Sequence, residues 1–237
     1  MIHHIINGDN VRGDVIFLHG FGGSTVSFAY AANIISKQAF RTTLVDMYGF
    51  GKTPPLDRPM TLDDYVKSIE EIIEYYRMEN VILTAHSFGG RVAIRLAASN
   101  RRIKKLVLTD SAGIPPRRAL KYYFKVYSYK LFKKLGITLN TGSRDYKGLS
   151  DVMKKTFVNI VNDDLTPYLD KIDCPALLVW GKNDSETPLY MAEIMKKNIS
   201  DSALIVFENC GHFCYLEEPY RFIKILSAFC VDGGEAV

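Results

Sequence analysis

Short apolar runs alternate with helical patterns along most of this 237-residue chain, and this alternation limits the fold more than any other feature. The runs are aliphatic or β-branched at nearly every position, which is typical of strands that are buried on both faces of a parallel sheet. We expect such strands near residues 15–18, 42–45, 81–84, 106–109, 176–180 and 203–207. Strands that alternate with helices at this spacing predict a doubly wound, mostly parallel α/β sheet with right-handed crossovers.

The segments between the runs carry helical periodicity. Apolar residues from Leu62 to Tyr76 recur at steps of three and four, which is typical of one apolar face of a helix. Thr61 and Asp64 stand three residues apart and predict a capping box at the start of this helix. Further helices are expected near residues 88–99, 189–198 and 219–229.

Residues 115–163 interrupt the alternation. They contain a helical stripe over residues 120–135 and a second helix that begins after Ser150. We therefore expect a small helical cap at 115–163, inserted into a core made of residues 1–114 and 164–237. The cap carries eleven Lys and Arg against three Asp and Glu, although the whole chain has a net charge of only +4.

The basic cap has three interpretations. The favoured one is a lid whose Lys residues face solvent while its apolar stripe, including Phe124 and Tyr127, covers a pocket. The second is a cap that selects anionic acyl substrates. The third is docking at a membrane surface, because basic amphipathic helices lie at such interfaces.

The segment Ala85-His86-Ser87-Phe88-Gly89-Gly90 follows a predicted strand and opens a predicted helix. It fits the pattern G-x-S-x-G with alanine in the first position. A sharp strand–turn–helix of this kind needs small neighbours, strains the central residue, and lifts the serine hydroxyl to a helix N-terminus. The pattern predicts a nucleophilic serine; the alternative is an ordinary turn of small residues.

Four other segments support the nucleophile. They have the patterns H-G-x-G, D-x-x-G-x-G, an acid loop ending in proline, and a histidine loop, at residues 19–24, 46–53, 180–188 and 211–219. Together with the serine turn they resemble the α/β-hydrolase superfamily in the right order over almost the whole chain. The resemblance implies the α/β-hydrolase fold for the predicted doubly wound sheet.

The resemblance also implies roles for single residues. Ser87 would be the nucleophile, His212 the general base, and Asp184 the acid that orients the histidine. The backbone N–H groups of Phe21 and Phe88 would form the oxyanion hole, and their side chains would line the pocket. Asp110 is an alternative acid because it ends the strand after the serine turn; the fuller loop motif favours Asp184.

Other candidate sites are weaker. Cys210, His212 and Cys214 resemble metal ligands, but no second Cys/His pair stands at ligand spacing, so we expect no metal and no cofactor. Gly51-Lys52-Thr53 lacks the first glycine of a phosphate loop. His86 and His19 are expected to brace the serine turn and the oxyanion loop, and His3 and His4 to lie on the surface of an edge strand.

Composition and the lack of certain motifs indicate the expected cellular location and partners of the protein. We expect no secretory signal and no stable membrane insertion, because the start lacks a basic segment followed by an apolar one and no run reaches about 18 apolar residues. The four cysteines are typical of reduced thiols, which favours a cytoplasmic location. No nucleic-acid-binding motif is present. The sequence leaves the oligomeric state open.

The expected activity is that of a carboxylesterase that cleaves a small or medium ester through an acyl-enzyme. One alternative is a C–C bond hydrolase or lyase acting on an acidic diene or diketone. Arg91, four residues after Ser87, is similar to an arginine that holds a carboxylate in a menaquinone-pathway enzyme, although we favour a helix-surface role. The other alternative is a non-catalytic ligand receptor on the same fold.

Overall fold

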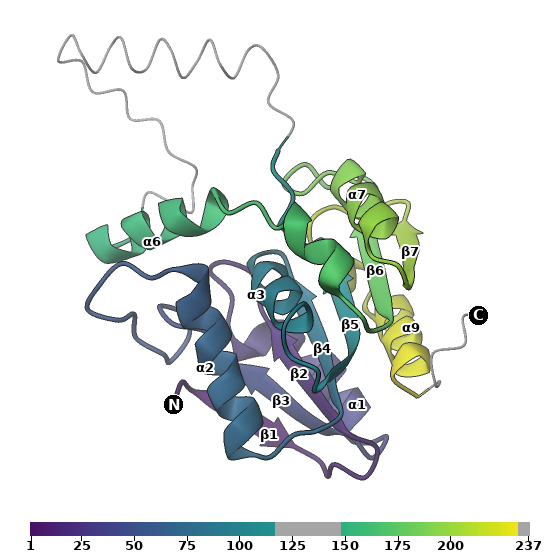
Figure 1. The fold of residues 1–237 in the computed structure, drawn as a ribbon. Coiled ribbons are helices and arrows are strands. Elements are labelled where there is room, and N and C mark those ends of the chain that lie inside the picture. Colours follow the sequence, from purple (N-terminus) through teal and green to yellow (C-terminus); the bar gives the residue numbers. More distant parts are fainter. Residues whose placement is uncertain (117–147, 232–237) are drawn as a thin grey trace, which may run out of the picture.

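The computed structural model describes residues 1–116 and 148–231, and its centre is a seven-stranded sheet (Figure 1). The strands are β1 (His4–Asn7), β2 (Asp14–Leu18), β3 (Arg41–Val45), β4 (Val81–His86), β5 (Ile103–Thr109), β6 (Ala176–Gly181) and β7 (Ser202–Phe207). Their order across the sheet is β1-β3-β2-β4-β5-β6-β7. Among the strands that the structure describes, only β1 pairs antiparallel to its neighbour, so the predicted mostly parallel sheet is confirmed.

Helices cover both faces of the sheet. They are η1 (Thr25–Phe28), α1 (Ala29–Ser36), α2 (Leu62–Tyr75), α3 (Phe88–Ala97), α6 (Asp151–Val161), η2 (Thr166–Lys171), α7 (Tyr190–Asn198), α8 (Cys214–Glu217) and α9 (Pro219–Val231). Figure 1 shows α2 and α3 on one face and α1 and α9 on the other. The capping box of Thr61 and Asp64 is present at the start of α2.

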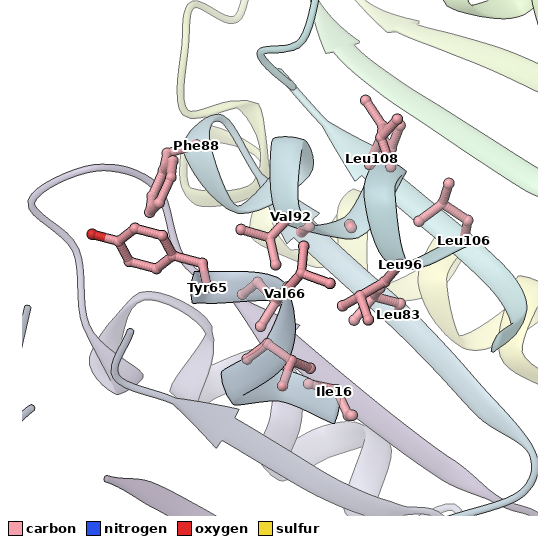
Figure 2. Close-up of a cluster of buried hydrophobic side chains, with 14 of the residues drawn as sticks. Ile16, Tyr65, Val66, Leu83, Phe88, Val92, Leu96, Leu106 and Leu108 are labelled. Atoms are coloured by element: carbon pink, nitrogen blue, oxygen red, sulfur yellow. The ribbon is translucent and has the colours of Figure 1, made fainter. Parts of the chain in front are cut away.

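The sheet separates two hydrophobic cores. On β2, Ile16 and Leu18 belong to the core beneath α2 and α3, whereas Val15 and Phe17 belong to the core beneath α1 and α9. Figure 2 shows the first core, where Ile16 and strand residues of β4 and β5 lie beside side chains of α2 and α3. Burial of alternate residues on opposite faces explains why the strands are apolar throughout.

The strand order places β4 at the centre of the sheet. The chain passes from β2 to β3 on one side and then crosses back to β4 on the other side. Loops that follow β2 and β4 therefore diverge at the carboxyl edge of the sheet, which is where α/β proteins form their ligand sites. The serine turn follows β4 at this edge.

Helix α6 crosses the same edge (Figure 1). Ser150 caps it by accepting a hydrogen bond from the Met153 N–H, as predicted. Thr156 and Asn159 attach it to the loop before α2, because Thr156 Oγ1 accepts from the Met60 N–H at 2.9 Å and Asn159 donates to the Met60 carbonyl at 3.1 Å. The first predicted cap helix lies outside the described residues, so the 115–163 boundaries stay a prediction.

Candidate active site

Ser87 occupies the strained turn that the sequence predicts between β4 and α3. Its backbone has φ 48° and ψ −112°, a left-handed conformation that is uncommon for residues other than glycine. Small neighbours make the turn possible: a Cβ on Gly89 would lie 2.5 Å from the carbonyl oxygen of Leu18 at the end of β2. The helix therefore starts directly against the neighbouring strand, with Ser87 at its N-cap.

The loop after β2 lies beside this turn. A Cβ on Gly20 would lie 2.6 Å from His86 Nδ1 and 3.3 Å from Ser87 Cβ, so only glycine allows the close approach. Within residues 1–116 and 148–231, the backbone N–H groups of Phe21 and Phe88 have no hydrogen-bond acceptor. A free donor on the loop after β2 and another at the N-terminus of α3, both next to the serine turn, are the kind of donors that an oxyanion hole requires.

Two buried side chains hold the loop after β2 in place. His19 Nδ1 donates to the Gly20 carbonyl at 2.7 Å, and its Nε2 accepts from the Met47 N–H at 3.2 Å. Burial lowers the pKa of His19, so the ring is neutral and makes both contacts. Asp46 accepts from the Thr25 N–H at 2.6 Å and from His3 at 2.8 Å. The prediction for His19 is thus confirmed, whereas His3 is half-buried and not a plain surface residue.

A chain of hydrogen bonds connects Ser87, His212 and Asp184. His212 Nε2 lies 3.0 Å from Ser87 Oγ, and Nδ1 lies 2.9 Å from Asp184 Oδ2. With the ring proton on Nδ1, His212 donates to Asp184 and its Nε2 accepts from Ser87. Ser87 comes from the turn after β4, Asp184 from the loop after β6 and His212 from the loop after β7, so residues far apart in sequence are adjacent at one edge of the sheet.

The pKa shifts of His212 and Asp184 suit the transfer of a proton from Ser87 to His212. Burial alone would lower the pKa of His212, but the hydrogen bond and negative charge of Asp184 outweigh burial and raise it. Burial would raise the pKa of Asp184, yet the hydrogen bonds from His212 and Thr187 lower it. A carboxylate that stays ionised beside a histidine stabilises the imidazolium that forms when the histidine takes a proton.

His86 holds the loop that carries His212 through a hydrogen bond. Its Nε2 donates to the carbonyl oxygen of His212 at 2.7 Å, and burial lowers its pKa to about 3. The ring is therefore neutral at physiological pH and serves as a hydrogen-bond donor. This contact agrees with the predicted bracing role.

Asp110, the alternative acid, makes no contact with His212. It is fully buried at the end of β5, where Oδ1 accepts from the Gly181 N–H at 2.8 Å and Oδ2 from the Cys214 N–H at 3.1 Å. Burial raises its pKa to about 6. Asp110 therefore connects the ends of β5 and β6 to the histidine loop, and Asp184 rather than Asp110 accepts the hydrogen bond from His212 Nδ1.

A cavity of about 310 Å³ opens above Ser87. Its lining among the described residues is Phe21, Ser87, Phe88, Arg91, Ala112, Ile114, Pro116, Phe157, Ile160, Val161, Glu186, Thr187 and Met191. Phe157 of α6 packs edge-on against Phe21 at 5.0 Å between ring centroids, so α6 forms part of the wall. Phe124 and Tyr127, predicted to bind substrate, lie outside the described residues.

The surface role favoured for Arg91 is wrong. The residue is only 6% exposed because α6 and the segment that follows it cover α3. Its guanidinium donates to the Asp163 carbonyl at 2.7 Å and to the Val161 carbonyl at 3.4 Å, and burial lowers its pKa to about 10. Arg91 also lines the same cavity as Ser87.

Two residues near Ser87, His212 and Asp184 were not predicted from the sequence. Thr187 Oγ1 donates to Asp184 Oδ2 at 2.6 Å, and the Thr187 N–H donates to Asp184 Oδ1 at 3.0 Å. Glu186 Oε2 lies 3.4 Å from His212 Nε2. The available signal was the spacing, because an aspartate often bonds backbone groups two and three residues later in a turn.

No three His, Cys, Asp or Glu side chains within residues 1–116 and 148–231 group as metal ligands would. The two ring nitrogens of His212 face Ser87 and Asp184, and Cys214 Sγ lies 3.2 Å from Thr109 Oγ1. In the same part of the chain, no helix has the length and apolarity needed to cross a membrane.

Comparison with known proteins agrees with this geometry. The family model for the alpha/beta hydrolase family matches residues 15–225. The chain is 26% identical to a 2-hydroxy-6-oxononadienedioate/2-hydroxy-6-oxononatrienedioate hydrolase of Pseudomonas putida, over 91% of this chain and 86% of that protein. It is also 26% identical to the pimeloyl-[acyl-carrier protein] methyl ester esterase of Nitrosomonas europaea, over 91% and 94% of the two chains.

A solved structure shows the same fold. The esterase of Exiguobacterium antarcticum matches with a TM-score of 0.80 and 24% identity, covering 98% of this chain and 96% of that one. The family match spans both the serine turn and the histidine loop. The chain therefore belongs to the alpha/beta hydrolase family, and its activity is that of a hydrolase.

Proposed function

We propose that the protein is a carboxylesterase that cleaves a small or medium ester through an acyl-enzyme. The observation that carries the proposal is the hydrogen-bonded chain from Ser87 through His212 to Asp184, which opens into a cavity. A serine hydroxyl is a weak nucleophile at neutral pH, and an adjacent histidine held by a carboxylate activates it. An esterase among the curated relatives supports the choice of an ester as substrate.

The proposed reaction has two halves. Ser87 Oγ bonds to the carbonyl carbon of the ester while its proton passes to His212 Nε2, and the N–H groups of Phe21 and Phe88 hold the negative oxygen. The carbon–oxygen bond to the alcohol then breaks, and His212 returns the proton to the departing oxygen. Water then enters, and its oxygen bonds to the acyl carbon while His212 Nε2 takes one of its protons. The bond between the acyl carbon and Ser87 Oγ breaks, and His212 gives that proton to Oγ, which frees the acid and restores Ser87.

The test is turnover of p-nitrophenyl esters from acetate to laurate. We expect saturable release of p-nitrophenol with an optimum at short or medium chains, because the described part of the cavity measures about 310 Å³. A folded protein that turns over none of these esters would contradict the carboxylesterase proposal.

A second candidate is hydrolysis of a C–C bond in an acidic substrate. The buried Arg91 favours it, since this cationic residue lines the cavity and its hydrogen bonds among the described residues go to carbonyl oxygens, with only the charges of Asp163 and Asp164 acting on it from nearby. A related hydrolase from Pseudomonas putida is named for dioic acid substrates. Arginine binds carboxylates through paired hydrogen bonds, so this residue suits an acid group on the acyl side.

Paired substrates test the role of Arg91. For Arg91→Met we expect a loss of about tenfold or more in kcat/KM with p-nitrophenyl monoesters of a dicarboxylic acid, because a hydrogen-bonded charge pair is lost. Esters of the monocarboxylic acid of equal length provide the comparison. An equal loss for both substrates would show that Arg91 only supports the wall of the cavity.

A further inference from the structure

A second carboxylate faces the nitrogen of His212 that contacts Ser87. Glu186 Oε2 lies 3.4 Å from His212 Nε2, and Ser87 Oγ lies 3.0 Å from the same atom. The Glu186 side chain is 62% exposed, whereas that of His212 is only 8% exposed, and both Glu186 and Ser87 line the cavity. The loop after β6 thus supplies one carboxylate to each ring nitrogen of the histidine.

The carboxylate of the buried Asp184 fixes the backbone of Glu186. The Glu186 N–H donates to Asp184 Oδ1 at 2.8 Å, and the next N–H, that of Thr187, donates to the same oxygen at 3.0 Å. Asp184 in turn is held by His212 through Oδ2. The turn that orients the histidine therefore also sets where the side chain of Glu186 begins, beside the mouth of the cavity.

Glu186 lies close to the place where the alcohol half of the ester would bind. In the proposed reaction His212 Nε2 gives its proton to the departing alcohol, whose oxygen must come within about 3 Å of that nitrogen. Because Glu186 Oε2 is 3.4 Å from the same nitrogen, the departing oxygen lies no more than about 6 to 7 Å from the carboxylate. A positive charge on the alcohol lies a few bonds beyond this oxygen, and where it approaches the carboxylate to about 6 to 7 Å the attraction favours binding about threefold even at the dielectric constant of water.

We infer that Glu186 makes the leaving-group side of the cavity selective for alcohols that carry a positive charge, such as amino-alcohol and quaternary ammonium esters, and disfavours anionic leaving groups. This inference rests on the proposed esterase function. It concerns the alcohol half of the ester, whereas Arg91 comes from α3 and bears on the acyl half.

The same carboxylate acts on His212. Among residues 1–116 and 148–231, the titratable groups that face the histidine are Asp184 and Glu186 on the loop after β6, Asp110 at the end of β5, and the neutral His86 at the end of β4. The negative charge of Glu186 adds to those that raise the pKa of His212. Since His212 must be neutral to accept the serine proton, removal of this charge moves the acidic limb of kcat/KM to lower pH.

The experiment compares butyrylcholine with 3,3-dimethylbutyl butyrate. The two esters share the acyl group and the shape of the alcohol, and they differ only in the positive charge. In low salt we expect kcat/KM for the choline ester to exceed that for the neutral ester by about three- to tenfold. In Glu186→Gln we expect the ratio to approach one and the acidic limb to move to lower pH.

Glu71→Gln is the matched control, because it removes the same charge from the exposed face of α2, away from the cavity. It should leave both the ratio and the pH profile unchanged. A wild-type ratio of one, or a ratio that survives Glu186→Gln, overturns the inference while leaving the esterase proposal intact. A folded wild-type protein that turns over neither these esters nor p-nitrophenyl esters overturns the esterase proposal and this inference with it.

Discussion

Replacement of Ser87 by alanine is expected to lower kcat for ester hydrolysis by about 10⁶-fold. Without Oγ there is no atom to form the acyl-enzyme, and His212 loses the hydroxyl that lies 3.0 Å from its Nε2. The fold should survive, because alanine adds no bulk to the tight turn and the backbone contacts of this residue remain. The measurement is single-turnover and steady-state kinetics alongside the circular dichroism spectrum.

Ser68→Ala is the control for this prediction. Ser68 is also a buried serine, but it lies on α2 and its hydroxyl donates to the Tyr65 carbonyl. It should retain wild-type kinetics. If Ser87→Ala kept the activity of the wild type, Ser87 would not be the nucleophile. If the wild type bound esters without turnover and the variant bound them equally well, the receptor alternative would be favoured.

Replacement of Asp184 by asparagine is expected to lower kcat by about 10⁴-fold. The asparagine amide can donate to Nδ1 of His212, which then carries its proton on Nε2 and can no longer accept the proton of Ser87. In the wild type, the 2.9 Å hydrogen bond from His212 Nδ1 to Asp184 Oδ2 keeps the ring proton on Nδ1. The loss should appear in kcat, measured with the best ester of the p-nitrophenyl series.

Asp110→Asn is the matched comparison, since it alters the alternative acid, also a buried carboxylate, in the same way. Its two oxygens accept from the N–H groups of Gly181 and Cys214, and asparagine keeps one acceptor oxygen but turns an NH2 donor toward the other N–H. We expect a loss of about 1–3 kcal/mol in the free energy of unfolding with a much smaller effect on kcat. Urea unfolding and kinetics on both variants separate these outcomes; the reverse order of kcat losses would make Asp110 the acid.

The strands and main helices could be predicted because they bury regular patterns. The runs that became β2 and β4 are apolar on both faces since a core lies on each side of the sheet. Helix α1 was missed because its sequence has no polar stripe to mark a face, and η1 and η2 are too short to show a period.

The proposed catalytic residues could be predicted because tight backbone geometry limits the residues that fit. Gly20 is required where the loop after β2 packs against His86, and Gly89 is required where α3 packs against the end of β2, so both positions can be recognised in the sequence as glycines. Arg91 could not be placed, because whether a charged residue on a helix faces solvent depends on what packs over it. Here the last residue of α6 and the chain just after it supply carbonyl oxygens to the guanidinium, and no local pattern encodes that contact.

The most direct test of the central claim is the mass of the enzyme during turnover. The protein is mixed with the best p-nitrophenyl ester, quenched in acid within the first turnovers, digested, and analysed by mass spectrometry. The account predicts one added acyl group, located on the peptide that contains Ser87 and absent from Ser87→Ala. An acyl group on another residue, or rapid turnover in which no acylated enzyme is ever trapped, would contradict it.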